Sequence, residues 1–309
     1  MSRELHPQAK DILTELGDKG LPPKRALEPE AARRDLEALL ADRGDPVPLG
    51  QVLNTAIPGP DGGLSVRIYR PKADRALPVL VYFHGGAWIR GNLETHDPVC
   101  RRIAARANCL VIAVDYRLAP EHQFPAQIED SYAAVEWATT YAETIGGDPE
   151  SVAVGGDSAG GNLAAAVSLL ARDRDGPALV HQLLLYPTLN YHEDLPSYGE
   201  NEEYFGTRVG RDWTWEIYLG NDVHSRNAYA VPFETTEPDG VPSATVLTAE
   251  FDMLRDEGQI YADRLRDAGV DVTELVYDDV FHAFLNFPRL ATADEAFDDV
   301  ANALDAALE

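Results

Sequence analysis

VAVGGDSAGGN, residues 152–162, is the stretch of sequence that decides the fold. Its apolar start favours a buried strand, and the alanine- and leucine-rich run at residues 161–171 predicts a helix directly after it. Gly156, Ser158 and Gly160 form a G-x-S-x-G pattern at the turn between the two elements. Such a turn strains the serine backbone and projects the hydroxyl above the sheet, and side chains at the glycine positions would collide across it. Ser158 is therefore a candidate nucleophile.

Strand-like runs repeat on both sides of this turn. Residues 52–57 and 64–69 flank the turn sequence PGPDGG, which predicts an antiparallel hairpin. Continuous apolar runs, typical of strands buried on both faces, follow in the middle of the chain. The remaining predicted strands are 77–83, 110–114, 151–154, 180–186, 244–248 and 272–277. The predicted helices are 31–40, 130–141, 161–171, 256–268 and 292 to the end. This alternation predicts an α/β fold with a central, mostly parallel eight-stranded sheet flanked by helices.

Two segments carry no strand signal. The first 45 residues have helical spacing only and end at a Gly-Asp-Pro break. Residues 188–241 also lack strands and contain a group of aromatic side chains, namely Tyr204, Phe205, Trp213, Trp215 and Tyr218. A structureless loop of that length is uncommon in a compact domain. We therefore expect residues 1–45 and 188–241 to form a cap, and residues 46–187 and 242–309 to form the catalytic domain.

The sequence HGGAW, residues 84–88, follows the predicted strand 77–83. Successive glycines allow backbone amides to face a cavity without obstruction, so Gly85 and Gly86 are candidate donors to an oxyanion. The amide of Ala159 is the third candidate, because it lies at a helix N-terminus. We expect His84 to hold this loop rather than to act in catalysis. Trp88 is expected to line a substrate pocket, with a simple core position as the alternative.

A serine hydroxyl needs an adjacent base to become a good nucleophile. His282 directly follows the last predicted strand, which is where the base lies when the chain order is Ser, Asp, His. Asp252 follows the penultimate strand and is our prediction for the acid that fixes the imidazole tautomer. Glu250 and Asp256 are rivals for that role, and Glu257 is expected to be a structural partner.

The charge balance excludes some classes of protein. The 309 residues include 52 acidic and 26 basic side chains, a formal net charge of −26. Nucleic-acid binding is disfavoured, because a phosphate backbone requires a basic face. Acidity spread along the whole chain predicts a halophilic protein, since salt screens the self-repulsion, with an ordinary acidic enzyme as the alternative.

The remaining composition bears on the compartment. The polar start resembles no signal peptide, and no apolar run has the roughly 18 residues that a membrane span requires. We therefore expect a cytoplasmic protein without a membrane span. Cys100 and Cys109 are expected to be small buried residues, and a bridge between them is left open.

Taken together, the motifs resemble the hormone-sensitive-lipase family of esterases. The resemblance spans about residues 50–309 and rests on HGGAW at 84–88, DYRLAPE at 115–121, FPA at 124–126, GDSAGGN at 156–162, and Asp252 and His282 in their settings. It implies an α/β-hydrolase fold with a helical cap, no metal and no cofactor, and hydrolysis of short to medium acyl esters. Three positions depart from the family pattern: Ala87 and Ala283 replace common glycines, and Met253 replaces a usual proline.

The predicted function is thus a serine carboxylesterase whose partner is a small-molecule ester. Besides Trp88, we expect Asp157 and Phe284 to line the substrate pocket. An amidase, peptidase or acyl transferase with the same triad is one alternative, and a binding receptor on a hydrolase scaffold is another. An edge strand such as 272–277 offers a way for two copies to pair as a homodimer.

Overall fold

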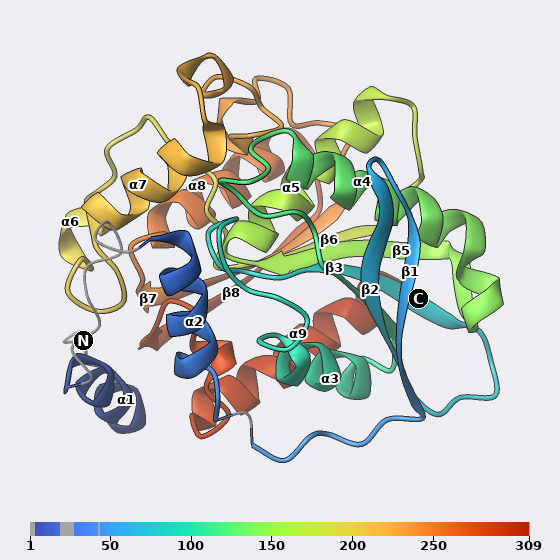
Figure 1. Cartoon of the computed structure of the whole chain (residues 1–309), viewed down its shortest axis with the longest axis horizontal. Coiled ribbons are helices and arrows are strands. Elements are labelled where there is room, and N and C mark those ends of the chain that lie inside the picture. The colour runs from blue at the N-terminus through green and yellow to red at the C-terminus, as the bar shows by residue number, and fades with distance from the viewer. Residues whose placement is uncertain (1–3, 19–27, 43, 309) are drawn as a thin grey trace.

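The computed structural model describes residues 4–18, 28–42 and 44–308. Within these residues, eight strands form one sheet in the order β1-β2-β4-β3-β5-β6-β7-β8 (Figure 1). The strands are β1 (Gln51–Gly59), β2 (Gly62–Arg70), β3 (Leu77–Phe83), β4 (Leu110–Val114), β5 (Gly147–Asp157), β6 (His181–Leu185), β7 (Ser243–Phe251) and β8 (Val272–Phe281). From β4 to β8 all neighbours are parallel, whereas β2 is antiparallel to both of its neighbours. The predicted α/β fold with a mostly parallel eight-stranded sheet is confirmed.

The hairpin at the start of the sheet is also confirmed. β1 and β2 pair in register from the Gln51–Arg70 pair to the Gly59–Gly62 pair, so the turn contains only Pro60 and Asp61. Each of the eight predicted strands coincides with an observed one, and the largest boundary differences are at the start of β5, Gly147, and at the end of β8, Phe281.

Helices cover both faces of the sheet (Figure 1). The apolar side chains of α4 (Ala126–Tyr141), α5 (Ala159–Asp173) and α8 (Arg255–Asp267) belong to one core cluster. Those of α3 (Asp97–Arg106) and α9 (Ala291–Leu308) belong to the second cluster, on the opposite face. Sequence reasoning missed α3 because its ten residues include four charged side chains and bury only Val99, Cys100, Ile103 and Ala104.

The two segments without strands contribute four further helices. The first segment holds α1 (Pro7–Asp18) and α2 (Pro29–Leu39), and its residues 1–3, 19–27 and 43 lie outside the described part of the chain. The second segment holds α6 (Pro196–Glu200), α7 (Arg208–Leu219) and two short 3-10 helices. Arg33 of α2 donates to the carbonyl of Ile89 at 2.8 Å, and Trp215 of α7 packs against Trp88. Both segments therefore contact the loop that follows β3.

Three other features bear on the predictions. Cys100 and Cys109 are buried free thiols, so the bridge left open above does not form. β8 lies at one edge of the sheet, and pairing of two copies there stays a prediction. Among the described residues, no helix has both the length and the apolar character needed to cross a membrane.

Candidate active site

The carboxyl ends of four strands define one place in the fold. His84 directly follows β3, and Ser158 directly follows β5. Asp252 follows Phe251, the last residue of β7, and His282 follows Phe281, the last residue of β8. Because parallel strands present their carboxyl ends at one edge of the sheet, residues separated by up to 198 positions in the chain are brought to one site.

The turn at Ser158 is as tight as its sequence predicts. The serine backbone has φ 54° and ψ −114°, a region that side-chain-bearing residues seldom occupy. A Cβ atom on Gly160 would lie 1.8 Å from the carbonyl oxygen of Phe83, and one on Gly156 would lie 2.4 Å from that same oxygen. Both glycines are therefore required for the turn to pack beside β3.

Ser158, His282 and Asp252 form a hydrogen-bonded chain. The Oγ of Ser158 lies 3.0 Å from Nε2 of His282, and Nδ1 of His282 lies 2.7 Å from Oδ2 of Asp252. Asp252 is 1% exposed and its Oδ1 accepts from the amide of Leu254 at 2.8 Å. Since the carboxylate can only accept, Nδ1 carries the proton and Nε2 is left to accept from the serine hydroxyl.

The rival carboxylates are engaged elsewhere. Glu250 and Asp256 both form ion pairs with Arg255, at 3.0 and 2.8 Å. Glu257 is fully buried, and its Oε2 accepts from the amides of Leu189 and Asn190. Burial raises the pKa of Glu257 to about 7, against the opposing influence of the Arg211 charge and these two amides. The structure thus brings Asp252, and none of the rivals, to the imidazole.

In the loop after β3, the structure contradicts the prediction for one of the oxyanion donors. The amide of Gly85 donates to Oδ1 of Asp157 at 2.9 Å, so it is not free to bind substrate. By contrast, the amides of Gly86 and Ala87 donate to no acceptor within the described part of the chain. Ala87 lines the same cavity as Ser158. The donor set that fits the geometry is therefore Gly86, Ala87 and Ala159, the last being the first residue of α5, where an amide has no intrahelical acceptor.

Asp157 lies beneath this loop rather than in the pocket, so the prediction that it lines the pocket is wrong. It is 2% exposed and accepts from the hydroxyl of Tyr82 at 2.8 Å and from His96 at 3.3 Å, in addition to the Gly85 amide. Burial alone would raise the pKa of Asp157, but His96 and these hydrogen bonds outweigh it and hold the pKa below its usual range. A charged carboxylate therefore anchors the loop from below.

His84 has the structural position expected of it. Its ring stacks on Tyr116 with centroids 4.3 Å apart, and its Nδ1 donates to the carbonyl of Gly85 at 2.8 Å. Burial lowers the pKa of His84 to about 3. The ring is therefore neutral near pH 7 and orients the loop without adding charge to the site.

The cavity above Ser158 has a volume of about 70 Å³. It is lined by Ala87, Trp88, Ser158, Thr188, Phe205, Gly206, Thr207, Gly210, Arg211, Thr214, Asp252, Met253, Leu254 and His282. Trp88 lies in this wall and stacks on Tyr218 of α7 with centroids 4.0 Å apart. Phe284 has no exposed surface and packs against Tyr186 and Tyr277 in the core, so its predicted pocket position is wrong.

Sequence reasoning missed much of the wall that comes from residues 188–241. The aromatic group in that segment indicated Phe205, but Thr207, Gly210, Arg211 and Thr214 had no signal that sets them apart from surface residues. They reach the site only because the start of α7 is folded over it.

Two departures from the family pattern have a backbone explanation. Ala87 and Ala283 have φ angles of 57° and 63°, in the left-handed region that favours glycine. Alanine adopts this region at a cost of order 1 kcal/mol. Glycine is thus the less strained residue at both positions, and Met253, the third departure, lines the pocket directly.

Comparison with known proteins agrees with this fold. A family model described as alpha/beta hydrolase fold matches residues 80–286. Carboxylesterase NlhH of Mycobacterium tuberculosis is 44% identical over 238 residues, 74% of each chain. A hyperthermophilic esterase from Pyrobaculum calidifontis superposes with a TM-score of 0.93 at 37% identity over 98% of each chain. A thermostable esterase from Pseudomonas putida superposes with a TM-score of 0.95 at 32% identity, over 100% of this chain and 99% of its own.

The fold, the serine turn and these similarities define an α/β hydrolase, and the chain belongs to that family. Within it, the motifs and relatives place the protein in the hormone-sensitive-lipase group, and it is a carboxylic ester hydrolase.

Proposed function

We propose that the protein is a serine carboxylesterase in which Ser158 is the nucleophile, His282 the general base and Asp252 the acid that orients it. The single observation that supports this assignment is the chain of contacts from Ser158 Oγ to His282 Nε2 at 3.0 Å and from His282 Nδ1 to Asp252 at 2.7 Å. Both distances are within the reach that proton transfer and imidazole orientation require.

The proposed reaction has two steps. His282 takes the hydroxyl proton while Ser158 Oγ attacks the ester carbonyl, and the amides of Gly86, Ala87 and Ala159 stabilise the oxyanion. Protonated His282 then gives its proton to the departing alcohol, which leaves an acyl group on Ser158. In the second step His282 activates a water molecule, which releases the carboxylic acid and restores the serine.

The size of the cavity favours small substrates. At about 70 Å³ it is far below the roughly 300–1,000 Å³ of ordinary ligand pockets. We propose short to medium acyl chains, and a cap made by the described helices of residues 1–45 together with residues 188–241. In support of the cap, α7 contributes Gly210, Arg211 and Thr214 to the pocket wall.

The test is hydrolysis of p-nitrophenyl esters from acetate to laurate, in molar salt, by the wild type and by Ser158→Ala. We expect the substitution to abolish turnover while the circular dichroism spectrum is unchanged, and the rate to peak at a short chain. Undiminished activity in folded Ser158→Ala would refute the nucleophile. A peak at laurate would refute the short-chain proposal.

The alternatives remain distinguishable. An amidase or acyl transferase would use the same three residues, so matched ester and amide substrates, with and without an added acyl acceptor, separate these activities. A receptor would bind a small molecule tightly without turnover. The compartment stays a prediction.

We also propose that the protein is halophilic, on the basis of its formal charge of −26. Salt screens repulsion between exposed charges that are more than about 10 Å apart at 0.1 M, and more than about 3 Å apart at 1 M. Stability should therefore depend on molar salt in a way that an ordinary acidic enzyme does not show.

A further inference from the structure

One charged side chain in the wall of the catalytic pocket has no part in the mechanism above. Of the described residues that line the pocket, Arg211 is the single lysine or arginine. Its side chain is only 9% exposed, although it comes from the start of α7, at the rim of the fold. Arginine is seldom buried to this extent unless its charge and its donors are used.

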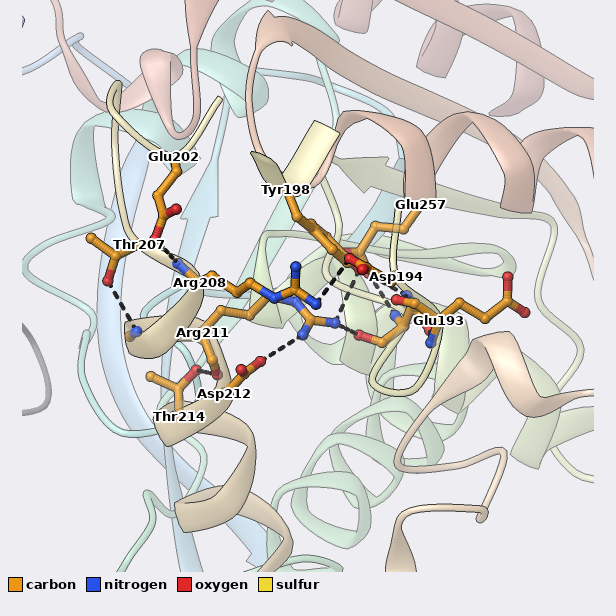
Figure 2. Close-up of polar contacts among 12 residues, drawn as sticks. Glu193, Asp194, Tyr198, Glu202, Thr207, Arg208, Arg211, Asp212, Thr214 and Glu257 are labelled. Atoms are coloured by element: carbon orange, nitrogen blue, oxygen red, sulfur yellow. Dashed lines mark hydrogen bonds and ion pairs between the residues drawn. The ribbon is translucent and has the colours of Figure 1, made fainter. Parts of the chain in front are cut away.

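The protein itself satisfies only part of this guanidinium. Nη2 donates to the carbonyl of Asn190 and to the hydroxyl of Tyr198, the latter at 3.0 Å, and Nη1 pairs with Asp212 at 3.0 Å (Figure 2). The plane also lies over the Tyr198 ring, 4.3 Å from its centroid. These bonds occupy three of the five N–H groups of an arginine.

Nε and one N–H of Nη1 are left over. Nε is buried and has no hydrogen-bond partner among the residues that the structure describes. A buried donor without a partner is costly, and more so on a charged group than on a neutral one, so a ligand oxygen that accepts from it is stabilised correspondingly. The surrounding pocket favours such an oxygen, because the hydroxyl of Thr207 and the N-terminal turn of α7 lie in the same wall.

We propose that Arg211 determines substrate specificity, by donating to a second oxygen acceptor on the ester, either a carboxylate or a ketone. The preferred substrates are then polar esters, such as half-esters of dicarboxylic acids and keto esters, rather than plain alkyl esters. This inference rests on the proposed esterase function and refines its substrate class.

The experiment compares three ethyl esters of nearly identical shape: 4-methylpentanoate, 4-oxopentanoate and hydrogen succinate. They carry a methyl group, a ketone oxygen or a carboxylate at the same place, so size is held constant. A merely apolar pocket would disfavour the two polar esters, which must lose water on binding. We expect the wild type to have a kcat/KM at least tenfold higher for one of the polar esters than for 4-methylpentanoate.

Arg211→Met keeps most of the side-chain length but removes every donor. We expect it to reduce kcat/KM for the preferred polar ester at least tenfold more than kcat/KM for 4-methylpentanoate, mainly through KM. Arg208→Met is the matched control. Arg208 lies on the same helix and pairs with exposed Asp194 at 2.9 Å, but it does not line the catalytic pocket. The control should keep the wild-type preference.

Two outcomes would overturn the proposal. One is a wild type that prefers 4-methylpentanoate. The other is an Arg211→Met variant that loses activity equally on all three esters, which would mean that Arg211 only ties α7 to Asn190 and Tyr198. Calorimetric binding of the three esters to Ser158→Ala, with and without Arg211→Met, gives the same comparison without turnover. Failure to hydrolyse any ester would therefore count against the esterase function alone.

Discussion

The strained backbone at Ser158 leads to a test that separates stability from chemistry. With φ 54° and ψ −114°, this residue occupies a region in which a Cβ atom costs about 1–3 kcal/mol. Ser158→Ala keeps the Cβ and removes the hydroxyl, whereas Ser158→Gly removes both. Each variant loses the hydrogen bond to His282, so the difference between them isolates the strain.

The expected magnitude follows from two opposing effects. Glycine relieves the strain of about 1–3 kcal/mol but adds about 0.5–1 kcal/mol of unfolded-state entropy. Ser158→Gly should therefore unfold with a free energy on the order of 1 kcal/mol higher than Ser158→Ala, or a melting temperature higher by roughly 2 °C. Both variants should be inactive. A higher free energy of unfolding for Ser158→Gly would show that the backbone conformation needed at the nucleophile lowers the stability of the wild type.

The assay is urea unfolding at one fixed molar salt concentration, followed by tryptophan fluorescence. Ala306→Gly, on an exposed position of α9, is the control. There the same exchange should lower the free energy of unfolding by about 0.5–1 kcal/mol, because no strain is relieved. If Ser158→Gly is no more stable than Ser158→Ala, the backbone at this turn is not strained and the reasoning is refuted.

Three further predictions concern charge and packing. Glu257→Gln should become more stable relative to the wild type as pH rises. Because the pKa of Glu257 is raised to about 7, the wild type has this contribution to stability in full below about pH 4.5 and loses it, about 3 kcal/mol in all, by pH 7. If the free energies of unfolding in urea of the two proteins change with pH in parallel, this argument is contradicted. Asp157→Asn should lower the free energy of unfolding by about 2 kcal/mol at pH 7, since neutral hydrogen bonds replace charge-assisted ones. Because the pKa of Asp157 is lowered, the difference in stability between wild type and variant should shrink as pH falls through that pKa. A difference that does not change with pH would count against the argument. Thermal melts of the wild type should show a higher midpoint in 2 M than in 0.1 M KCl because of the net charge of −26, and equal midpoints would exclude halophilic behaviour.

Much of this molecule could be predicted from the sequence because the relevant signals are local. A buried strand needs a short apolar run, and the serine turn needs Gly156 and Gly160 at fixed spacing. Residues placed just after parallel strands must meet at one edge of the sheet, so the serine motif and strand order select Ser158 and His282 and make Asp252 the first candidate for the acid.

Which amides face the substrate, and which side chains line the pocket, depends on contacts between residues far apart in the sequence. Gly85 and Ala87 belong to one short motif, and the hydrogen bond from Gly85 to Asp157 decides which amide is free. That bond joins residues 72 positions apart. Asp157 and Phe284 stand beside catalytic candidates in the sequence, but packing turns both of their side chains into the interior.

The sequence by itself determined the sheet, the turn that carries the nucleophile and the three candidate catalytic residues, since each depends on a short pattern or on strand order. Only the tertiary structure decided which amides face the substrate, which carboxylate meets the imidazole and that Arg211 lies in the pocket wall. Those outcomes depend on where separate segments pack against one another, and on which polar groups find partners when they do.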